Sequence, residues 1–439
     1  MGEQPSLRRL TQLIQGRLTR SRTRKMIREL LAAFPGGPAG SALAAARARG
    51  FDYGAAFKAA GRAIDAPGRA AEIERAEASE LLREVSIQPF YRQWILVTDH
   101  PRFRTWSFCG LLLDACREWG FQDPPRALQT ARLGVQVAER LDRERYGEAR
   151  VNDLRARAWA TLGNAERILT DFRAAEMSFA KAELLLKGGT GDPVETALFL
   201  LFEASLLGHQ QRFSEAFRRL DRVVRIGRLT DDLHLCGKAL ITRGFLAGMA
   251  HEPGLSMRLL REGLPLVDAE AEPRLLVAAY HNLILGLTES GSLTEAADLL
   301  ERSAALYEHL GDRMSLIRRT WLEGKIALGR GELSRAESLF LAARGQLAER
   351  ELGYDAALLS LDLAQVYARQ GRGAEMRRLA EEMLPIFQSR AIRREAVSAL
   401  IVFQKAAEME RVTLGIVQEL SDSLQESRTT AGLRLRDSF

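Results

Sequence analysis

Small residues recur in this chain at a period of about 40, and no other feature limits the fold as strongly. One series begins at Ala175 and ends at Met376, with steps of 41, 40, 40, 40 and 40 residues. A second series lies four residues after the first, and a third lies twelve residues before it. The three series, each in chain order, are Ala175, Ala216, Ser256, Ala296, Ala336 and Met376; Phe179, Leu220, Leu260, Leu300, Phe340 and Ala380; and Gly163, Ala204, Gly244, Ile284, Gly324 and Ala364. Three series that agree over six copies predict a repeat architecture.

The residues within each copy favour two helices separated by a turn. Ala, Leu, Arg and Glu, which are strong helix formers, dominate the sequence. Spacings of three and four residues place the members of a copy on one helix face. Gly and polar residues such as Ser290-Gly291-Ser292 fall midway between the predicted helices, where they end one helix and cap the next. Each copy is therefore expected to be an antiparallel helix pair.

The clearest copy, 156–186, resembles the tetratricopeptide repeat. The matching residues are Trp159, Leu162, Gly163, Ala175, Phe179 and Ala182. The resemblance implies that small residues let the two helices approach closely while Trp159 and Phe179 fill the gaps between them. It also implies an all-α fold, a right-handed α–α superhelix. The residues before the repeats add the expectation of a small helical N-terminal module. The period exceeds the family's usual spacing of about 34 residues, as in longer bacterial variants, which leaves the superhelix pitch open.

The chain is expected to divide into five segments. The repeats account for most of it, and solenoids need end units that close the exposed core. The segments are a basic helical N-terminal module at 1–70, a degenerate helical repeat region at 71–154, six repeats at 155–390, capping helices at 391–425 and a flexible tail at 426–439.

Stacked helix pairs leave a long concave face that suits a peptide or a partner helix. The favoured function is therefore a scaffold or adaptor that binds a partner protein or peptide. The family resemblance implies which positions of the first helix face the groove, and Trp321 is the most prominent of them, although core packing would also explain a Trp there. The predicted contacts are Asn164, Arg167, Phe245, His281, Trp321, Lys325 and Gln365. Ala160 stands where chaperone-binding members have a lysine, so binding of chaperone C-termini is not expected.

Basic residues are concentrated at the N-terminus. Residues 1–50 have a net charge of +8, and the rest of the chain sums to −2. A solvated helix surface, an acidic partner and nucleic acid are three interpretations, and no aromatic residue accompanies the basic ones to favour nucleic acid. The alternative function is thus a transcriptional regulator that binds nucleic acid here and senses a peptide through its repeats. The residues concerned are Arg17, Arg20, Arg22, Arg24, Lys25 and Arg28.

The segment 29–37 is also similar to zinc-binding anti-sigma-type modules. Glu29, Phe34 and Gly37 stand where that family has a His and two Cys ligands. Zinc needs thiolate or imidazole ligands, so no metal is expected.

Catalytic signatures are missing from the sequence. It contains no phosphate-binding P-loop, no HExxH and no GxSxG, and its six His residues are dispersed. We therefore expect neither enzyme activity nor a cofactor. The three Cys residues have no CxxC spacing, and no apolar run is long enough to cross a membrane. A cytoplasmic location is the expectation that follows.

Overall fold

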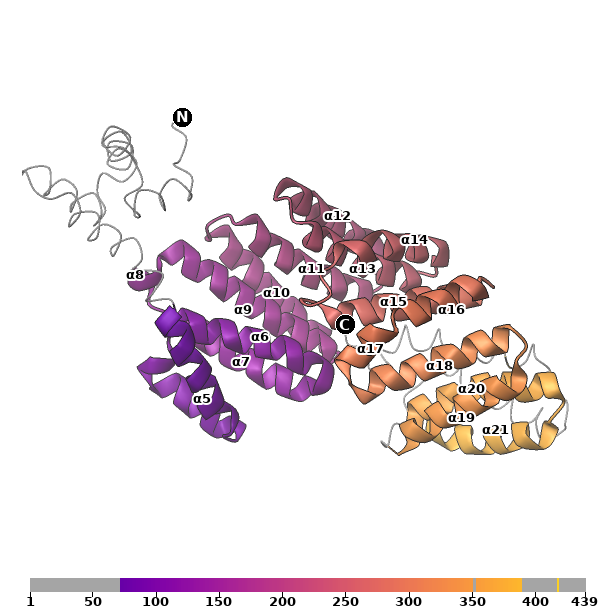
Figure 1. The fold of residues 1–439 in the computed structure, drawn as a ribbon. Coiled ribbons are helices and arrows are strands. Elements are labelled where there is room, and N and C mark those ends of the chain that lie inside the picture. The colour runs from indigo at the N-terminus through magenta and orange to yellow at the C-terminus, as the bar shows by residue number, and fades with distance from the viewer. Residues whose placement is uncertain (1–71, 350–352, 389–416, 418–439) are drawn as a thin grey trace, which may run out of the picture. The chain divides into compact units, whose positions relative to one another are not determined.

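The computed structural model describes residues 72–349, 353–388 and 417, and all that follows concerns these residues (Figure 1). Their regular elements are all helical. Contacts divide the chain into two units, 1–112 and 113–439, with the boundary inside α6 (Trp106–Gln122).

The first unit contains a helix over 72–86, α5 (Phe90–Asp99) and the short 3-10 helix η1 (Pro101–Phe103). Phe103 and Phe108 form its buried centre, with ring centroids 5.2 Å apart. The buried carboxylate of Glu74 accepts a hydrogen bond of 2.9 Å from the backbone N–H of Ser107. This bond joins the helix over 72–86 to the first turn of α6.

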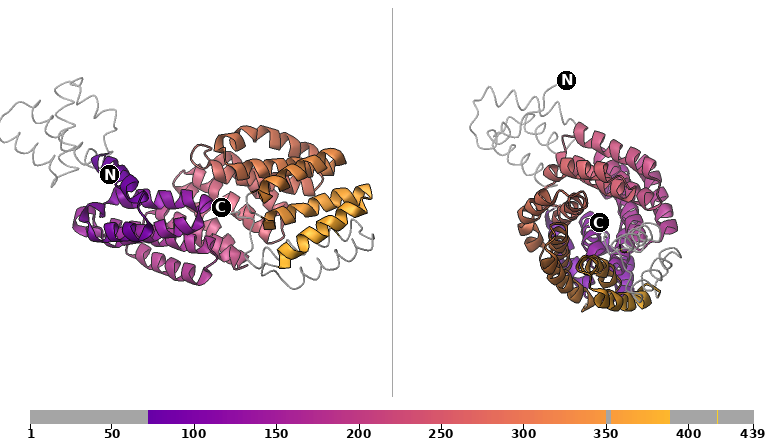
Figure 2. Two further views of the ribbon diagram at one scale, coloured as in Figure 1. Left: turned by 90° about the horizontal axis from the view of Figure 1, so that it is seen from below. Right: turned by 90° about the vertical axis from the view of Figure 1, so that its right-hand side faces the viewer.

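The second unit begins with the end of α6, with α7 (Pro124–Glu139) and with the one-turn α8 (Arg143–Tyr146). Six antiparallel helix pairs follow, and successive pairs contact one another in chain order (Figure 2). We call the first helix of a pair its A helix and the second its B helix. The A helices are α9 (Glu148–Ile168), α11 (Pro193–His209), α13 (Leu233–Met249), α15 (Pro273–Glu289), α18 (Arg313–Gly329) and α20 (Gly353–Gln370). The B helices are α10 (Phe172–Lys187), α12 (Phe213–Leu229), α14 (Pro253–Gly263) with η2 (Leu264–Leu266), α16 (Leu293–Arg302) with α17 (Ala304–Leu310), α19 (Leu333–Ala348) and α21 (Gly373–Gln388).

The three recurring series of the sequence lie at the centre of these pairs. All their members are buried except Ser256, which is half-buried. A Cβ atom added to Gly324 would lie 2.6 Å from the Phe340 ring, and one added to Gly163 would lie 3.2 Å from the Phe179 ring. In these two pairs a small residue of the A helix thus faces a large residue of the B helix, as the repeat pattern predicted.

A residue with left-handed backbone ends every A helix. These residues are Thr170, Gln211, His251, Gly291, Gly331 and Gly371. In each pair the next N–H bonds back to a carbonyl five residues earlier, as from Ser292 to Leu287 at 2.8 Å. Such a bond satisfies a carbonyl that the end of the helix would otherwise leave unpaired, and it turns the chain into the B helix.

The predicted all-α repeat fold is confirmed. The helical module at 1–70, the zinc-module similarity at 29–37, the cap at 391–425 and the tail at 426–439 lie outside the described residues, apart from Val417. The segment boundaries stay predictions.

Candidate partner-binding surface

One row of side chains crosses the A helices at the position that follows the small residue. The six residues of this row, which we call the A-helix row, are Asn164, Ser205, Phe245, Leu285, Lys325 and Gln365. All six are half-buried, whereas the small residues just before them are buried. Contacts join successive A helices from α9 to α18, so most of the row lies on one continuous layer of helices.

The chemistry of the A-helix row changes along its length. Phe245 and Leu285 in its middle pack partly into the apolar core and keep part of their surface exposed. Amide, hydroxyl and ammonium groups stand at its two ends. A segment lying along the row would therefore meet apolar surface in the middle and hydrogen-bonding groups on either side.

Four side chains from three A helices form a cluster that includes Lys325. Trp321 donates a hydrogen bond of 2.6 Å from Nε1 to Oδ2 of Asp362, and Lys325 Nζ lies 3.3 Å from Oδ1 of the same carboxylate. The His281 ring stacks on the Trp321 ring with centroids 5.5 Å apart, and the Lys325 ammonium lies 5.1 Å from the Trp321 centroid. Asp362 is 6% exposed, so the carboxylate at the base of this Trp321 cluster is buried. It holds the indole and the ammonium in place and balances the lysine charge.

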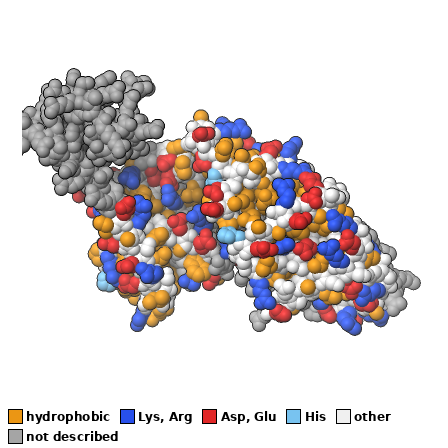
Figure 3. All heavy atoms as spheres, in the orientation of Figure 1, with side chains coloured by type: hydrophobic (Ala, Val, Ile, Leu, Met, Phe, Trp, Pro, Cys, Tyr) orange, Lys and Arg blue, Asp and Glu red, His pale blue; other side chains and the backbone are white. Residues whose placement is uncertain are grey.

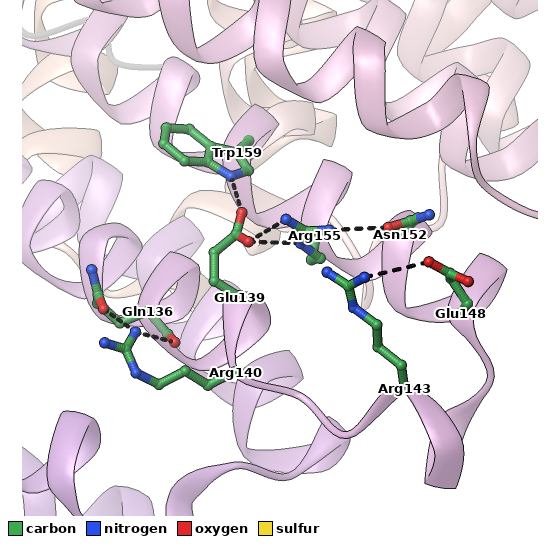
Figure 4. A network of polar contacts seen from close by, with 8 residues as sticks. All are labelled: Gln136, Glu139, Arg140, Arg143, Glu148, Asn152, Arg155 and Trp159. Atoms are coloured by element: carbon green, nitrogen blue, oxygen red, sulfur yellow. Dashed lines mark hydrogen bonds and ion pairs between the residues drawn. The ribbon is translucent and has the colours of Figure 1, made fainter.

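A second tryptophan is held in the same way at the other end of the repeats (Figure 4). Trp159 on α9 donates from Nε1 to Oε1 of Glu139 at 2.8 Å, and Arg155 Nε lies 2.8 Å from Oε2. Figure 4 shows Arg155 bridging between Glu139 and Asn152. In both clusters the carboxylate comes from outside the helix pair of its tryptophan: α7, which precedes the six pairs, supplies Glu139, and α20 of the last pair supplies Asp362. Glu139 therefore joins α7 to the first pair, and Asp362 joins the last two pairs.

The pKa of Glu139 is lower than that of an ordinary glutamate. Burial by itself would raise it, but the hydrogen bonds from Trp159 and Arg155 and the positive charge of Arg155 together outweigh burial. The folded state therefore favours the ionised carboxylate. Since the folded pKa lies below the unfolded value, the stabilisation is complete above the unfolded pKa of about 4.3 and is lost as pH falls through the folded pKa.

We expect Glu139→Gln to lower the free energy of unfolding by about 1 kcal/mol at pH 7, because the bond to Arg155 loses its charge. The difference from wild type should shrink between about pH 5 and pH 3, where the wild-type carboxylate becomes protonated. Circular dichroism melting curves of both proteins across this range check the prediction. A difference that stays constant with pH would contradict the assignment.

Arg167 differs from the other predicted contacts because it is only 3% exposed. Its Nε donates to Oδ1 of Asn164 at 3.0 Å, and its Nη1 lies 2.6 Å from Nε2 of His209. His209 in turn stacks on Phe172. Arg167 is therefore no longer assigned as a partner contact, because its guanidinium is buried and bridges two successive A helices. Sequence spacing placed it on the correct helix, but the contact that its guanidinium makes with His209 comes from another helix, where His209 stacks on Phe172.

Six of the seven predicted contacts are half-buried: Asn164, Phe245, His281, Trp321, Lys325 and Gln365. The structure brings His281, Trp321 and Lys325 together. Sequence reasoning missed Asp362, although an acidic residue within the apolar run Leu358–Val366 was a usable signal. The N-terminal residues Arg17, Arg20, Arg22, Arg24, Lys25 and Arg28 lie outside the described residues.

Among the described residues, no group of three or more His, Cys, Asp or Glu side chains is arranged to bind a metal ion. Cys109, Cys116 and Cys236 are buried thiols, and burial raises the pKa of Cys116 to about 12. No described helix combines the length and apolar character that crossing a membrane requires.

No protein-family model and no curated protein sequence matches the chain. Solved structures do match it. A Rap protein complexed with Competence and Sporulation Factor is similar with a TM-score of 0.52 and 13% identity, over 74% of this chain and 88% of that one. Aspartyl phosphate phosphatase F from Bacillus subtilis matches with a TM-score of 0.41 and 13% identity, over 71% and 96%, which is too distant to add to the argument. The likeness to the Rap protein shows the fold alone: the chain has a tetratricopeptide-like helical-repeat fold.

Proposed function

We propose that this protein is a non-enzymatic scaffold or adaptor that binds a protein or peptide segment along the A-helix row. The observation that carries the proposal is that one register position stays half-exposed in all six A helices while the position before it is buried. A repeated partial exposure of this kind provides a row of contacts for an extended ligand.

The Trp321 cluster supports the same proposal. A half-buried indole held by a buried carboxylate is rigid, and rigid aromatic side chains lose little entropy when a partner binds. The comparison with the Rap protein is consistent with a bound partner, since that protein was crystallised with Competence and Sporulation Factor. Phe245 and Leu285 favour a ligand with apolar side chains near its middle.

Peptides selected from a random 15-residue display library on the full-length protein provide the test. Their affinities would be measured by fluorescence anisotropy against wild type, Leu285→Ala and Gln365→Ala. We expect Leu285→Ala to weaken binding by about tenfold, because a central apolar contact contributes about 1–2 kcal/mol. Gln365→Ala at one end of the row should have a smaller effect.

Leu341→Ala is the matched control, since Leu341 is a partly exposed leucine on the B helix α19. This substitution should leave the affinities unchanged. Selected peptides that bind equally well to wild type and Leu285→Ala, but less well to Leu341→Ala, would contradict the proposed surface.

A further inference from the structure

A line of arginines runs along α12 on the side opposite its buried face. Arg218, Arg222 and Arg225 follow the i, i+4, i+7 spacing of one helix face, and Arg228 adjoins them. All four are exposed, whereas Ala216, Leu220 and Val223 form the buried face of the same helix. With a rise of 1.5 Å per residue, Arg218 and Arg225 lie about 10 Å apart along the helix axis. We call these four residues the α12 arginine stripe.

The arginines of the stripe have no close carboxylate partner, although the charge of Arg218 acts on Glu215 at longer range. Within the described part of the chain, none of its four guanidinium groups forms an ion pair or a side-chain hydrogen bond. The two acidic residues of α12 bind other arginines: Glu215 pairs with Arg212, and Asp221 lies 2.6 Å from Arg243. Like charges three and four residues apart destabilise a helix. The spacing of the four arginines by itself therefore disfavours the helix.

The stripe is also particular to this repeat. It occupies positions two, six and nine after the small residue of the B helix. No other B helix is basic at all three positions. The equivalent residues are Met177, Lys181 and Leu184; Arg258, Glu262 and Pro265; Asp298, Arg302 and Ala305; Ser338, Ala342 and Gly345; and Arg378, Glu382 and Pro385. Acidic and basic side chains are interspersed over most of the face that Figure 3 shows. The repeat fold does not require a basic stripe.

Two exposed leucines lie where the stripe ends. Leu229, the last residue of α12, is 86% exposed and continues the line of Arg218, Arg222 and Arg225. Leu233 at the start of α13 is 58% exposed. A phosphate backbone gains nothing from exposed leucines, whereas an amphipathic protein helix can bury them. The combination favours a protein partner over nucleic acid.

We propose that the α12 arginine stripe, together with Leu229 and Leu233, is a second docking surface that binds an acidic helix of a partner protein. The partner helix presents carboxylates at i, i+4 and i+7 to the arginines and an apolar residue to Leu229. The stripe is on a B helix and faces away from the helix pairs, so this surface is separate from the A-helix row. The protein could then bind one partner on the A helices and another on α12.

A designed pair of helical peptides tests this proposal with the full-length protein. One peptide has three glutamates at i, i+4 and i+7 and a leucine at i+11. Its isomer has the same composition with the glutamates spread around the helix. Affinities at 50 and 150 mM NaCl would be measured by fluorescence anisotropy, with a 20-nucleotide single-stranded DNA as the nucleic-acid probe. Because the basic N-terminus also attracts acidic probes, the comparison is between variants that differ only in the body of the protein.

We expect the triple variant R218E/R222E/R225E to weaken binding of the patterned peptide by about tenfold or more, since three charge contacts become repulsive. R218K/R222K/R225K should keep most of the affinity. R173E/K181E/R258E is the matched control: it makes the same change in net charge at three exposed residues elsewhere and should have a smaller effect. Leu229→Ser should weaken binding of the peptide but not of DNA. Melting curves of these surface variants would check that each remains folded.

Three results would overturn the proposal. Equal affinity for the two isomers would show that only net charge is recognised. Equal losses in the α12 triple variant and its matched control would show that the stripe is not the contact. Tighter binding of DNA than of the patterned peptide at 150 mM NaCl, lost in R218E/R222E/R225E, would assign the stripe to nucleic acid instead.

Discussion

Phe340→Ala is expected to lower the free energy of unfolding of the repeats around it by about 3–5 kcal/mol. The Phe340 side chain is fully buried on α19 and fills the space beside Gly324 on α18. Alanine would leave a cavity there that the two helices cannot close, because Gly324 has no side chain to move into it. Hydrogen exchange of the α18 and α19 amides should report the loss, since repeat arrays can unfold in segments.

A substitution at Gly324 tests the same packing from the other helix, α18, and a substitution at Gly345 on α19 is its control. Gly324→Ala places a Cβ 2.6 Å from the Phe340 ring and should destabilise the pair by about 1–3 kcal/mol. Gly345→Ala is the control: its Cβ would meet nothing within 4 Å, so it should stabilise α19 by about 0.5–1 kcal/mol. The double variant G324A/F340L should be less destabilised than the sum of its two single changes. Similar stabilities for Gly324→Ala and Gly345→Ala would show that the two helices do not pack as described.

Asp362→Leu is expected to destabilise the protein by about 2–4 kcal/mol, because it leaves Lys325 and the Trp321 N–H without their acceptor. The side chain of Lys325 is 15% exposed, so water can satisfy it only in part. Asp362→Asn should cost less, since the amide oxygen can still accept from the indole. Denaturant unfolding followed by tryptophan fluorescence would measure both effects.

The double variant K325M/D362L separates the ion pair from the general effect of a leucine at this position. Removing both charges leaves no uncompensated ammonium, so the double variant should be more stable than Asp362→Leu alone. If it is less stable, the loss in the single variant reflects misfit of the leucine rather than an unpaired charge.

The helix pairs could be predicted because their determinants are local and repeat. Gly163, Phe179 and their counterparts recur at one period, and the glycines Gly163, Gly244 and Gly324 each face a large residue only sixteen positions away. Asp362 shows where such reasoning stops. Its partner Trp321 lies 41 residues away in the preceding helix pair, so the contact depends on how successive pairs stack. Spacing placed Arg167 on the A helix but could not show that His209, from the next pair, would meet it.

Recognising the α12 arginine stripe required both the sequence and the tertiary structure. Its spacing is visible in the sequence, but a line of arginines on a helix could equally be a row of ion pairs. Only the tertiary structure showed that Glu215 and Asp221 bind other arginines and that Leu229 remains exposed.

By itself, the sequence determined the all-α repeat fold, the succession of helix pairs and the packing of a small residue against a large one in the pairs that contain Gly163, Gly244 and Gly324. These features follow from periodic patterns of residue size and polarity, which act over a few turns of helix. Tertiary structure alone decided which polar side chains are paired with other residues and which remain exposed. Those outcomes depend on contacts between successive pairs, where a shift of one residue in the stacking would bring a different side chain opposite Asp362 or Arg167.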